Sequence, residues 1–273
     1  MPGYNDWLTL NLNPGDPNNL TKKLECDFHI GSVKNLTIND AADYTANLIH
    51  QNYKDLYLSF SGGLDSMFVA NVLTRNNIPF KPIIFDWYWQ EPECWYAYDW
   101  CEKHQIEPVV YTVTPDTEQE FLEKILRYAF KIKTPAKIGY IPIILTEIMP
   151  DTGKLLTGYG EPFYNSNFYS EPMGDVFEIA EHDYYMNLVF GSEHPGGFLS
   201  YTPELFFSLV RNIPTQLNTQ QAKAQIYGLD FRPKFNNVNV LPWGKYQTLR
   251  DKLVKPFEDT VALYNKADLL KLT

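Results

Sequence analysis

The stretch Leu56-Tyr57-Leu58-Ser59-Phe60-Ser61-Gly62-Gly63-Leu64-Asp65-Ser66-Met67 decides the fold of this chain. Its first five residues have the aliphatic and aromatic character of a buried strand, and residues 67–73 have the apolar spacing of a helix packed on a sheet. Gly62 and Gly63 allow a sharp turn between the two and a close approach to a ligand. The N–H groups and the dipole of the following helix face that turn, which predicts a phosphate-binding loop.

Three polar side chains in this loop refine the prediction. Ser61 and Ser66 add hydroxyl donors for a phosphate. Asp65 would repel a phosphate unless a divalent cation bridged the two, so the loop predicts Mg²⁺ with Asp65 as a ligand. The alternative is a Gly-Gly turn before a capped helix, in which Asp65 only complements the helix dipole.

The loop is not a Walker A loop, because it lacks the Gly-Lys-Ser/Thr ending. The segment Ser61-Gly62-Gly63-Leu64-Asp65-Ser66 instead resembles the SGGxDS loop of the N-type ATP pyrophosphatases. That family includes asparagine synthetase, GMP synthetase, NAD synthetase and the tRNA lysidine and thiolation enzymes. The resemblance implies that ATP is split between its α and β phosphates, that AMP passes to a substrate oxygen, and that the loop holds the departing pyrophosphate.

A second glycine turn follows in Thr157-Gly158-Tyr159-Gly160-Glu161-Pro162. It is similar to the Gly-x-Gly turn of the synthetase branch, and most like asparagine synthetase and β-lactam synthetase. In that branch the turn is followed by an aspartate that shares Mg²⁺ with the loop aspartate. Here Glu161 and Pro162 stand in its place, so Glu161 either supplies the metal ligand or simply ends a turn.

Strands expected at residues 56–60, 81–86, 108–113 and 154–157 alternate with helices expected at residues 41–50, 67–73, 94–104, 118–131 and 136–149. Asn39-Asp40 is the expected cap of the first of these helices. This alternation predicts an α/β fold, a parallel sheet with helices on both faces. The resemblance implies a Rossmann-like, adenine nucleotide alpha hydrolase-like version with a C-terminal helical or β appendage. We expect three regions, namely an N-terminal extension, an ATP-binding domain and a C-terminal substrate-binding or lid region, at residues 1–36, 37–165 and 166–273.

Ligands of such sheets lie beyond the carboxyl ends of the strands, where the loop, Asp86 and Gly158 should converge. Asp86 either accepts a hydrogen bond from the ribose hydroxyls or is a simple loop carboxylate. Arg232 and Lys234 lie in a segment that weakly resembles the Arg-x-Lys segment of asparagine synthetase. With Asp65 they form the expected catalytic set, or else they are ordinary surface bases. The expected nucleotide contacts are Ser59, Phe60, Ser61, Gly62, Gly63, Leu64, Asp65, Ser66, Phe85, Asp86, Gly158, Tyr159 and Gly160.

Composition limits the partners. The 273 residues carry a formal net charge of −10, which argues against a large nucleic-acid partner. No apolar run approaches a membrane span and the first residues lack signal-peptide features, so we expect a cytoplasmic protein without a membrane partner. Cys26, Cys94 and Cys101 form no metal-ligand or redox pair and are expected to be buried thiols.

Two further patterns concern recognition. Between residues 155 and 210 there is no Lys or Arg, and this acidic stretch is either solvated surface or a selector of a cationic or amine-bearing substrate. An aromatic cluster is expected to be core or subunit interface rather than a ligand platform, so a homo-oligomer is compatible with it. The cluster consists of Trp87, Tyr88, Trp89, Trp95, Tyr96, Tyr98 and Trp100.

These features predict an ATP- and Mg²⁺-dependent ligase that releases AMP and pyrophosphate. It adenylates a small-molecule carboxylate or amide oxygen for attack by ammonia or an amine. We expect no glutaminase domain like that of asparagine synthetase, because only a short segment precedes the loop. The alternatives are a base-modifying relative, of the 7-deazaguanine synthase or tRNA thiolation type, and a nucleotide-binding module without chemistry. The base-modifying relatives commonly use catalytic cysteines or zinc, and this chain has no CxxC.

Overall fold

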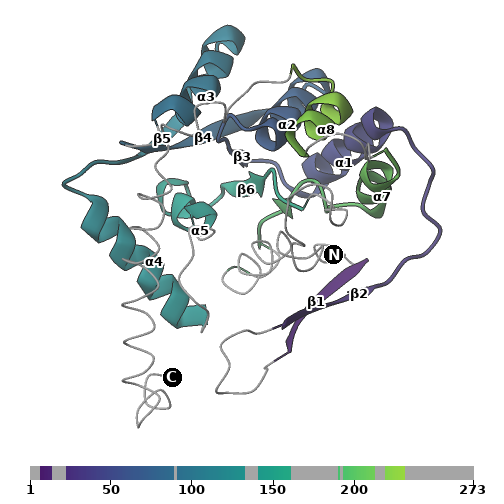
Figure 1. Ribbon diagram of the computed structural model, residues 1–273, viewed down its shortest axis with the longest axis horizontal. Helices are drawn as coiled ribbons and strands as arrows, with labels where there is room; N and C mark the ends of the chain where they lie inside the picture. The colour runs from purple at the N-terminus through teal and green to yellow at the C-terminus, as the bar shows by residue number, and fades with distance from the viewer. Residues whose placement is uncertain are drawn as a thin grey trace.

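The computed structural model describes residues 7–13, 23–88, 91–132, 141–160, 190, 193–212 and 219–230. These residues form a two-stranded antiparallel sheet and a five-stranded sheet (Figure 1). None of the helices in this part of the chain is long and apolar enough to cross a membrane.

The five-stranded sheet has the order β5-β4-β3-β6-β7, and every neighbouring pair of strands in it is parallel. The predicted parallel sheet is therefore confirmed. The strand bounds are β3 Leu56–Ser59, β4 Phe80–Trp87, β5 Val109–Val113, β6 Lys154–Thr157 and β7 Gly196–Gly197.

Helices cover both faces of this sheet (Figure 1). Their bounds are α1 Ile38–Asn52, α2 Leu64–Arg75, α3 Glu91–His104, α4 Glu118–Ile132, α5 Ile141–Leu145, α7 Pro203–Asn212 and α8 Thr219–Tyr227. Successive strand side chains point to opposite faces, so each strand feeds two cores. Leu58 belongs to the core that α1, α2, α3, α7 and α8 share, whereas Tyr57 belongs to the core that includes α4 and α5.

The strand order reverses at β3. The chain runs from β3 through β4 to the edge strand β5, then returns through α4 and α5 to β6 on the other side of β3. In open parallel sheets the ligand crevice lies at such a reversal, outside the carboxyl ends of the strands. The segments that follow β3 and β6 therefore occupy the position where this architecture binds ligands.

The N-terminal extension contains two strands in addition to those expected from the sequence. Strands β1 (Leu8–Asn13) and β2 (Lys23–Phe28) pair as an antiparallel hairpin. The leucines of β1 alternate with polar residues, a pattern that is typical of a strand. Its pairing partner, β2, lies beyond the turn-rich segment. Trp7, next to β1, is buried and its indole N–H donates to the Ser200 carbonyl at 3.2 Å, so the hairpin is attached to the segment before α7.

Two helices begin away from the expected residues, and a third changes type near its end. α1 starts after Thr37, whose hydroxyl oxygen accepts from the Asp40 N–H at 3.2 Å, and not after Asn39-Asp40. α3 begins three residues earlier than expected, at Glu91. Of the helix expected at residues 136–149, the described part begins at Ile141. It is α5 followed by the 3₁₀ turn η2 (Thr146–Ile148), a tighter helix that is frequent at the C-termini of α-helices.

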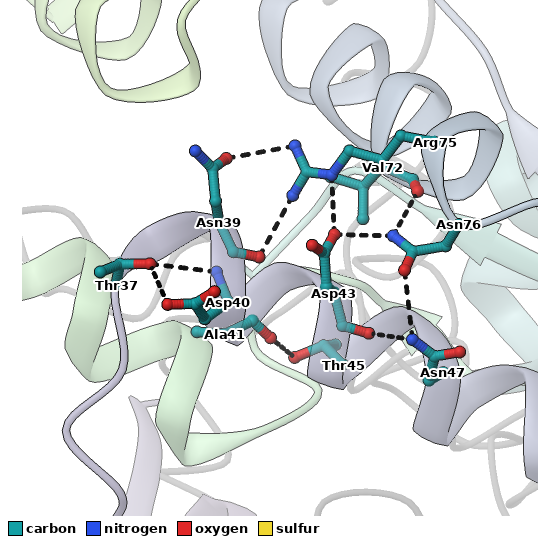
Figure 2. A network of polar contacts seen from close by, with 10 residues as sticks. All are labelled: Thr37, Asn39, Asp40, Ala41, Asp43, Thr45, Asn47, Val72, Arg75 and Asn76. Carbon is teal, nitrogen blue, oxygen red and sulfur yellow. Dashed lines mark hydrogen bonds and ion pairs between the residues drawn. The ribbon is translucent and has the colours of Figure 1, made fainter.

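A polar network joins α1 to the end of α2 (Figure 2). The Asp43 carboxylate accepts from Arg75 Nε at 2.7 Å and from Asn76 Nδ2 at 2.6 Å. Arg75 also donates to the Asn39 side chain and carbonyl, and Asn47 donates to Asn76. The network fixes the end of α2 that lies away from the loop.

The part of the C-terminal region that is described joins the main body. β7 adds a short fifth strand beside β6, and α7 and α8 complete the helical layer over α1 and α2. His194, just before β7, accepts the Leu155 N–H on Nδ1 at 3.0 Å. The domain boundaries at residues 36 and 165 remain predictions.

The aromatic cluster is divided between core and surface. Trp87 and Trp100 are buried, one in each core, which confirms the core interpretation for these two rings. Trp95 is 59% exposed and Tyr88 is 39% exposed. The homo-oligomer remains a prediction.

Candidate functional site

The loop between β3 and α2 makes the sharp turn that its sequence predicts. The Phe60 N–H donates to the Ile83 carbonyl at 2.8 Å, so pairing with β4 continues to the start of the turn. Gly62 has φ of 73°, and a Cβ there would lie 2.6 Å from the Ala97 backbone nitrogen. Only glycine combines this backbone conformation with contact to α3.

The turn leads directly into the N-terminus of α2. Gly63 is the N-cap residue, and none of the described side chains caps the helix. The first N–H groups of an α-helix have no acceptor within the helix, and the helix dipole makes this end positive. The arrangement is that of an anion-binding helix terminus.

The two loop serines form hydrogen bonds within the turn. Ser61 Oγ accepts from the Gly63 N–H at 3.2 Å, and Ser66 Oγ donates to the Gly63 carbonyl at 3.1 Å. The two hydroxyl oxygens are 3.3 Å apart. Ser61 is exposed and Ser66 is buried, so Ser61 is the hydroxyl that an incoming ligand meets first.

The second glycine turn lies directly against the first. A Cβ on Gly158 would be 2.9 Å from the Ser66 nitrogen and 3.1 Å from the Asp65 carbonyl carbon. Gly160 has φ of 95°, and a Cβ there would be 2.6 Å from the Ser200 nitrogen. The structure thus brings together the predicted turns after β3 and β6. Close packing against backbone atoms explains why both positions of the second turn are glycine.

Asp65 is held by two side chains of α8. Tyr227 OH donates to Asp65 Oδ1 at 2.8 Å, and Lys223 Nζ donates to Oδ2 at 2.9 Å. The Lys223 side chain is 14% exposed and that of Asp65 is 28% exposed, so the ion pair is largely shielded from water. The Tyr227 ring also stacks on Phe68 of α2, with centroids 4.4 Å apart.

Lys223 and Tyr227 are the site residues that sequence reasoning missed. They lie more than 150 residues from Asp65 in the chain. Their spacing of four on a helix places them on one face, and that is the only local signal they carry. The bases chosen from the sequence, Arg232 and Lys234, lie outside the described residues, as does Glu161.

The two predicted residues at the end of β4 point in different directions. Asp86 Oδ2 accepts from Tyr98 OH of α3 at 2.7 Å. Burial and this hydrogen bond raise the pKa of Tyr98, so its hydroxyl stays protonated and remains a donor. The Phe85 ring instead packs beside Tyr111 and Phe121 in the core under α4. Asp86 therefore has a structural partner, whichever of its two expected roles it also serves.

The donor set at the loop fits Mg²⁺ only together with phosphate. Nowhere among the described residues do three or more His, Cys, Asp or Glu side chains gather as a metal-binding group. Mg²⁺ is commonly bound by one or two carboxylates together with substrate phosphates and water. Asp65, in the first turn of α2, would be the protein's share of such a site.

No protein-family model and no curated protein matches the sequence. Among solved structures, the NMN synthetase from Francisella tularensis overlaps 79% of this chain and 96% of its own at 13% identity, with a TM-score of 0.35. The NH3-dependent NAD synthetase from Campylobacter jejuni, in complex with nitrate, overlaps 82% and 93% at 12% identity, with a TM-score of 0.35. A protein described as a predicted subunit of tRNA methyltransferase from Methanocaldococcus jannaschii overlaps 64% and 86% at 16% identity, with a TM-score of 0.32. Scores this low carry no argument about function.

Proposed function

We propose that this chain is an ATP-dependent ligase of the N-type ATP pyrophosphatase kind, which releases AMP and pyrophosphate. Its finer assignment is asparagine synthetase-like or β-lactam synthetase-like. In this proposal a small-molecule carboxylate or amide oxygen takes AMP from ATP, and ammonia or an amine then displaces the AMP.

One observation carries the proposal. The Ser61-to-Ser66 segment forms a glycine turn from β3 into the N-terminus of α2, which no described side chain caps. β3 lies between the parallel strands β4 and β6, at the point where the strand order reverses. The motif and its structural context agree, and such agreement is what separates a functional motif from a chance match.

In this proposal, groups of the chain itself bind the phosphates and supply positive charge beside them. The N–H groups of the first turn of α2 donate to the phosphate oxygens, and the exposed Ser61 hydroxyl adds a donor beside them. Lys223 brings a positive charge to the same end of α2. Bound Mg²⁺ would neutralise the phosphates and the negative charge that develops on them. Asp65 is the described residue that would hold it.

The base-modifying alternative depends on reactive thiols or zinc. Cys94 and Cys101 are both buried, as the sequence predicts, and burial raises the pKa of Cys101 to about 11. A nucleophilic cysteine needs the opposite shift, toward the thiolate. These two cysteines therefore favour the ligase over a cysteine-dependent relative.

The test follows the labelled α phosphate of ATP during incubation with Mg²⁺ and pools of carboxylates, amino acids and ammonia. We expect labelled AMP whose formation requires one acceptor pool. Asp65→Asn should lower the rate at least about 100-fold, because the metal loses its carboxylate. The matched control is Asp99→Asn, which makes the same change in an ion pair on α3. ADP as the sole product, or a fully active Asp65→Asn variant, would overturn the proposal.

A further inference from the structure

Asp65 is expected to bind a metal, yet both of its carboxylate oxygens accept hydrogen bonds from α8. One of the two donors is an ammonium group, and its ion pair with Asp65 is largely shielded from water. The carboxylate charge is therefore already balanced within the protein. Asp65 therefore differs from a carboxylate whose oxygens have no hydrogen-bond donor before a cation binds.

A metal ion on Asp65 Oδ2 would lie within a few ångströms of the Lys223 ammonium. Two cations at that separation repel strongly in a shielded site, where screening by water is weak. The repulsion disappears only if negative charge arrives with the metal or if the lysine moves away. Nucleotide phosphates bring that negative charge, and the N-terminus of α2 is placed to receive it.

We propose that Lys223 is the resident counter-ion of Asp65, a positioning residue that excludes free divalent cations and admits a metal only when it arrives with nucleotide phosphates. The proposal rests on the proposed function, because it assigns the order in which that site is loaded. The site then rejects the metal alone, although it contains a metal-binding carboxylate.

Lys223 and Tyr227 divide this task between them. Tyr227 anchors α8 through its stack on Phe68. It is the last residue of α8, and just beyond it the Leu229 N–H donates to the Ala224 carbonyl at 2.9 Å. Lys223 lies one turn earlier on a flexible four-carbon stem. The ammonium can therefore leave Asp65 for phosphate while Tyr227 keeps the helix in place.

The test measures Mn²⁺ as a paramagnetic substitute for Mg²⁺, by electron paramagnetic resonance, first alone and then with ATP. Wild-type protein should bind Mn²⁺ alone only weakly and bind it much more tightly with ATP. Lys223→Met should bind Mn²⁺ alone at least about tenfold more tightly than wild type, because a close positive charge has been removed. Lys223→Arg should behave like wild type, since it restores the charge.

Two further variants serve as controls, one for the loss of a lysine charge elsewhere and one for failure of the methionine variant to fold. Lys103→Met removes an equal charge from an exposed ion pair on α3 and should leave the Mn²⁺ affinity unchanged. Lys223→Gln keeps a hydrogen-bond donor for Asp65 without the charge, so it provides the same test if the methionine variant does not fold. Circular dichroism reports the fold of each variant.

The outcomes separate the two proposals. If neither neutral variant binds Mn²⁺ alone more tightly than wild type, the counter-ion role is overturned. That result leaves the proposed function standing as long as wild-type protein binds Mn²⁺ with ATP. If wild-type protein binds no ATP at all, the proposed function fails, and the loading order fails with it. Tighter binding of Mn²⁺ alone, in the neutral variants only, supports the counter-ion role.

Discussion

Gly62 is the residue on which the shape of the turn between β3 and α2 depends. It combines a left-handed backbone with contact to α3, whereas Gly228 has a similar φ of 62° and open space around it. Gly62→Ala should lower the free energy of unfolding by about 3 kcal/mol, from backbone strain and overpacking together. Gly228→Ala should cost about 1 kcal/mol, from strain alone. Urea unfolding followed by circular dichroism measures both, and equal losses would show that contact with α3 adds nothing.

The junction of α1 and α2 depends on Asp43, whose carboxylate serves two donors from the end of α2 (Figure 2). Asp43→Ala leaves Arg75 and Asn76 without this acceptor, and we expect a loss of about 1 kcal/mol in the free energy of unfolding. Asp99→Ala is the control, because its partner Lys103 is 65% exposed and such pairs contribute at most a few tenths. Urea unfolding compares the two variants, and equal losses would contradict the network.

Elements whose signal is local were predictable from the sequence. The strand and turn from Leu56 to Gly63 and strand β6 carry their own apolar runs and glycines, and both lie where they were expected. Elements that depend on a distant partner were not predictable. Strand β1 needs β2, and the environment of Asp65 needs Lys223 and Tyr227 of α8. Hydrophobic periodicity shows which face of α8 is apolar but not which helix it meets.

The stability of the whole protein should depend on pH through His194. Burial, followed by the nearby charge of Lys154, lowers the pKa of His194 to about 4. In the unfolded chain the value is near 6.5, so between these values the unfolded chain binds more protons. The free energy of unfolding should therefore fall as the pH drops through that interval. Because His194 is partly exposed, we expect a loss of only about 1 to 2 kcal/mol.

A variant isolates this histidine from the other groups that titrate at low pH. His194→Asn keeps an acceptor for the Leu155 N–H but cannot take up a proton. Urea unfolding at several values between about pH 7 and about pH 4.5 should show a flatter pH dependence in the variant. Parallel curves for the two proteins would contradict the assignment.

The attachment of the opening hairpin has a consequence for how mutations combine. Trp7 binds the Ser200 carbonyl, and the backbone of Ser200 lies against Gly160 in the turn after β6. We therefore expect a substitution at Trp7 to shift Ser200 and, through it, the turn after β6. Replacements at Trp7 and at Gly160 should show epistasis, so that the combined effect differs from the sum of the separate effects.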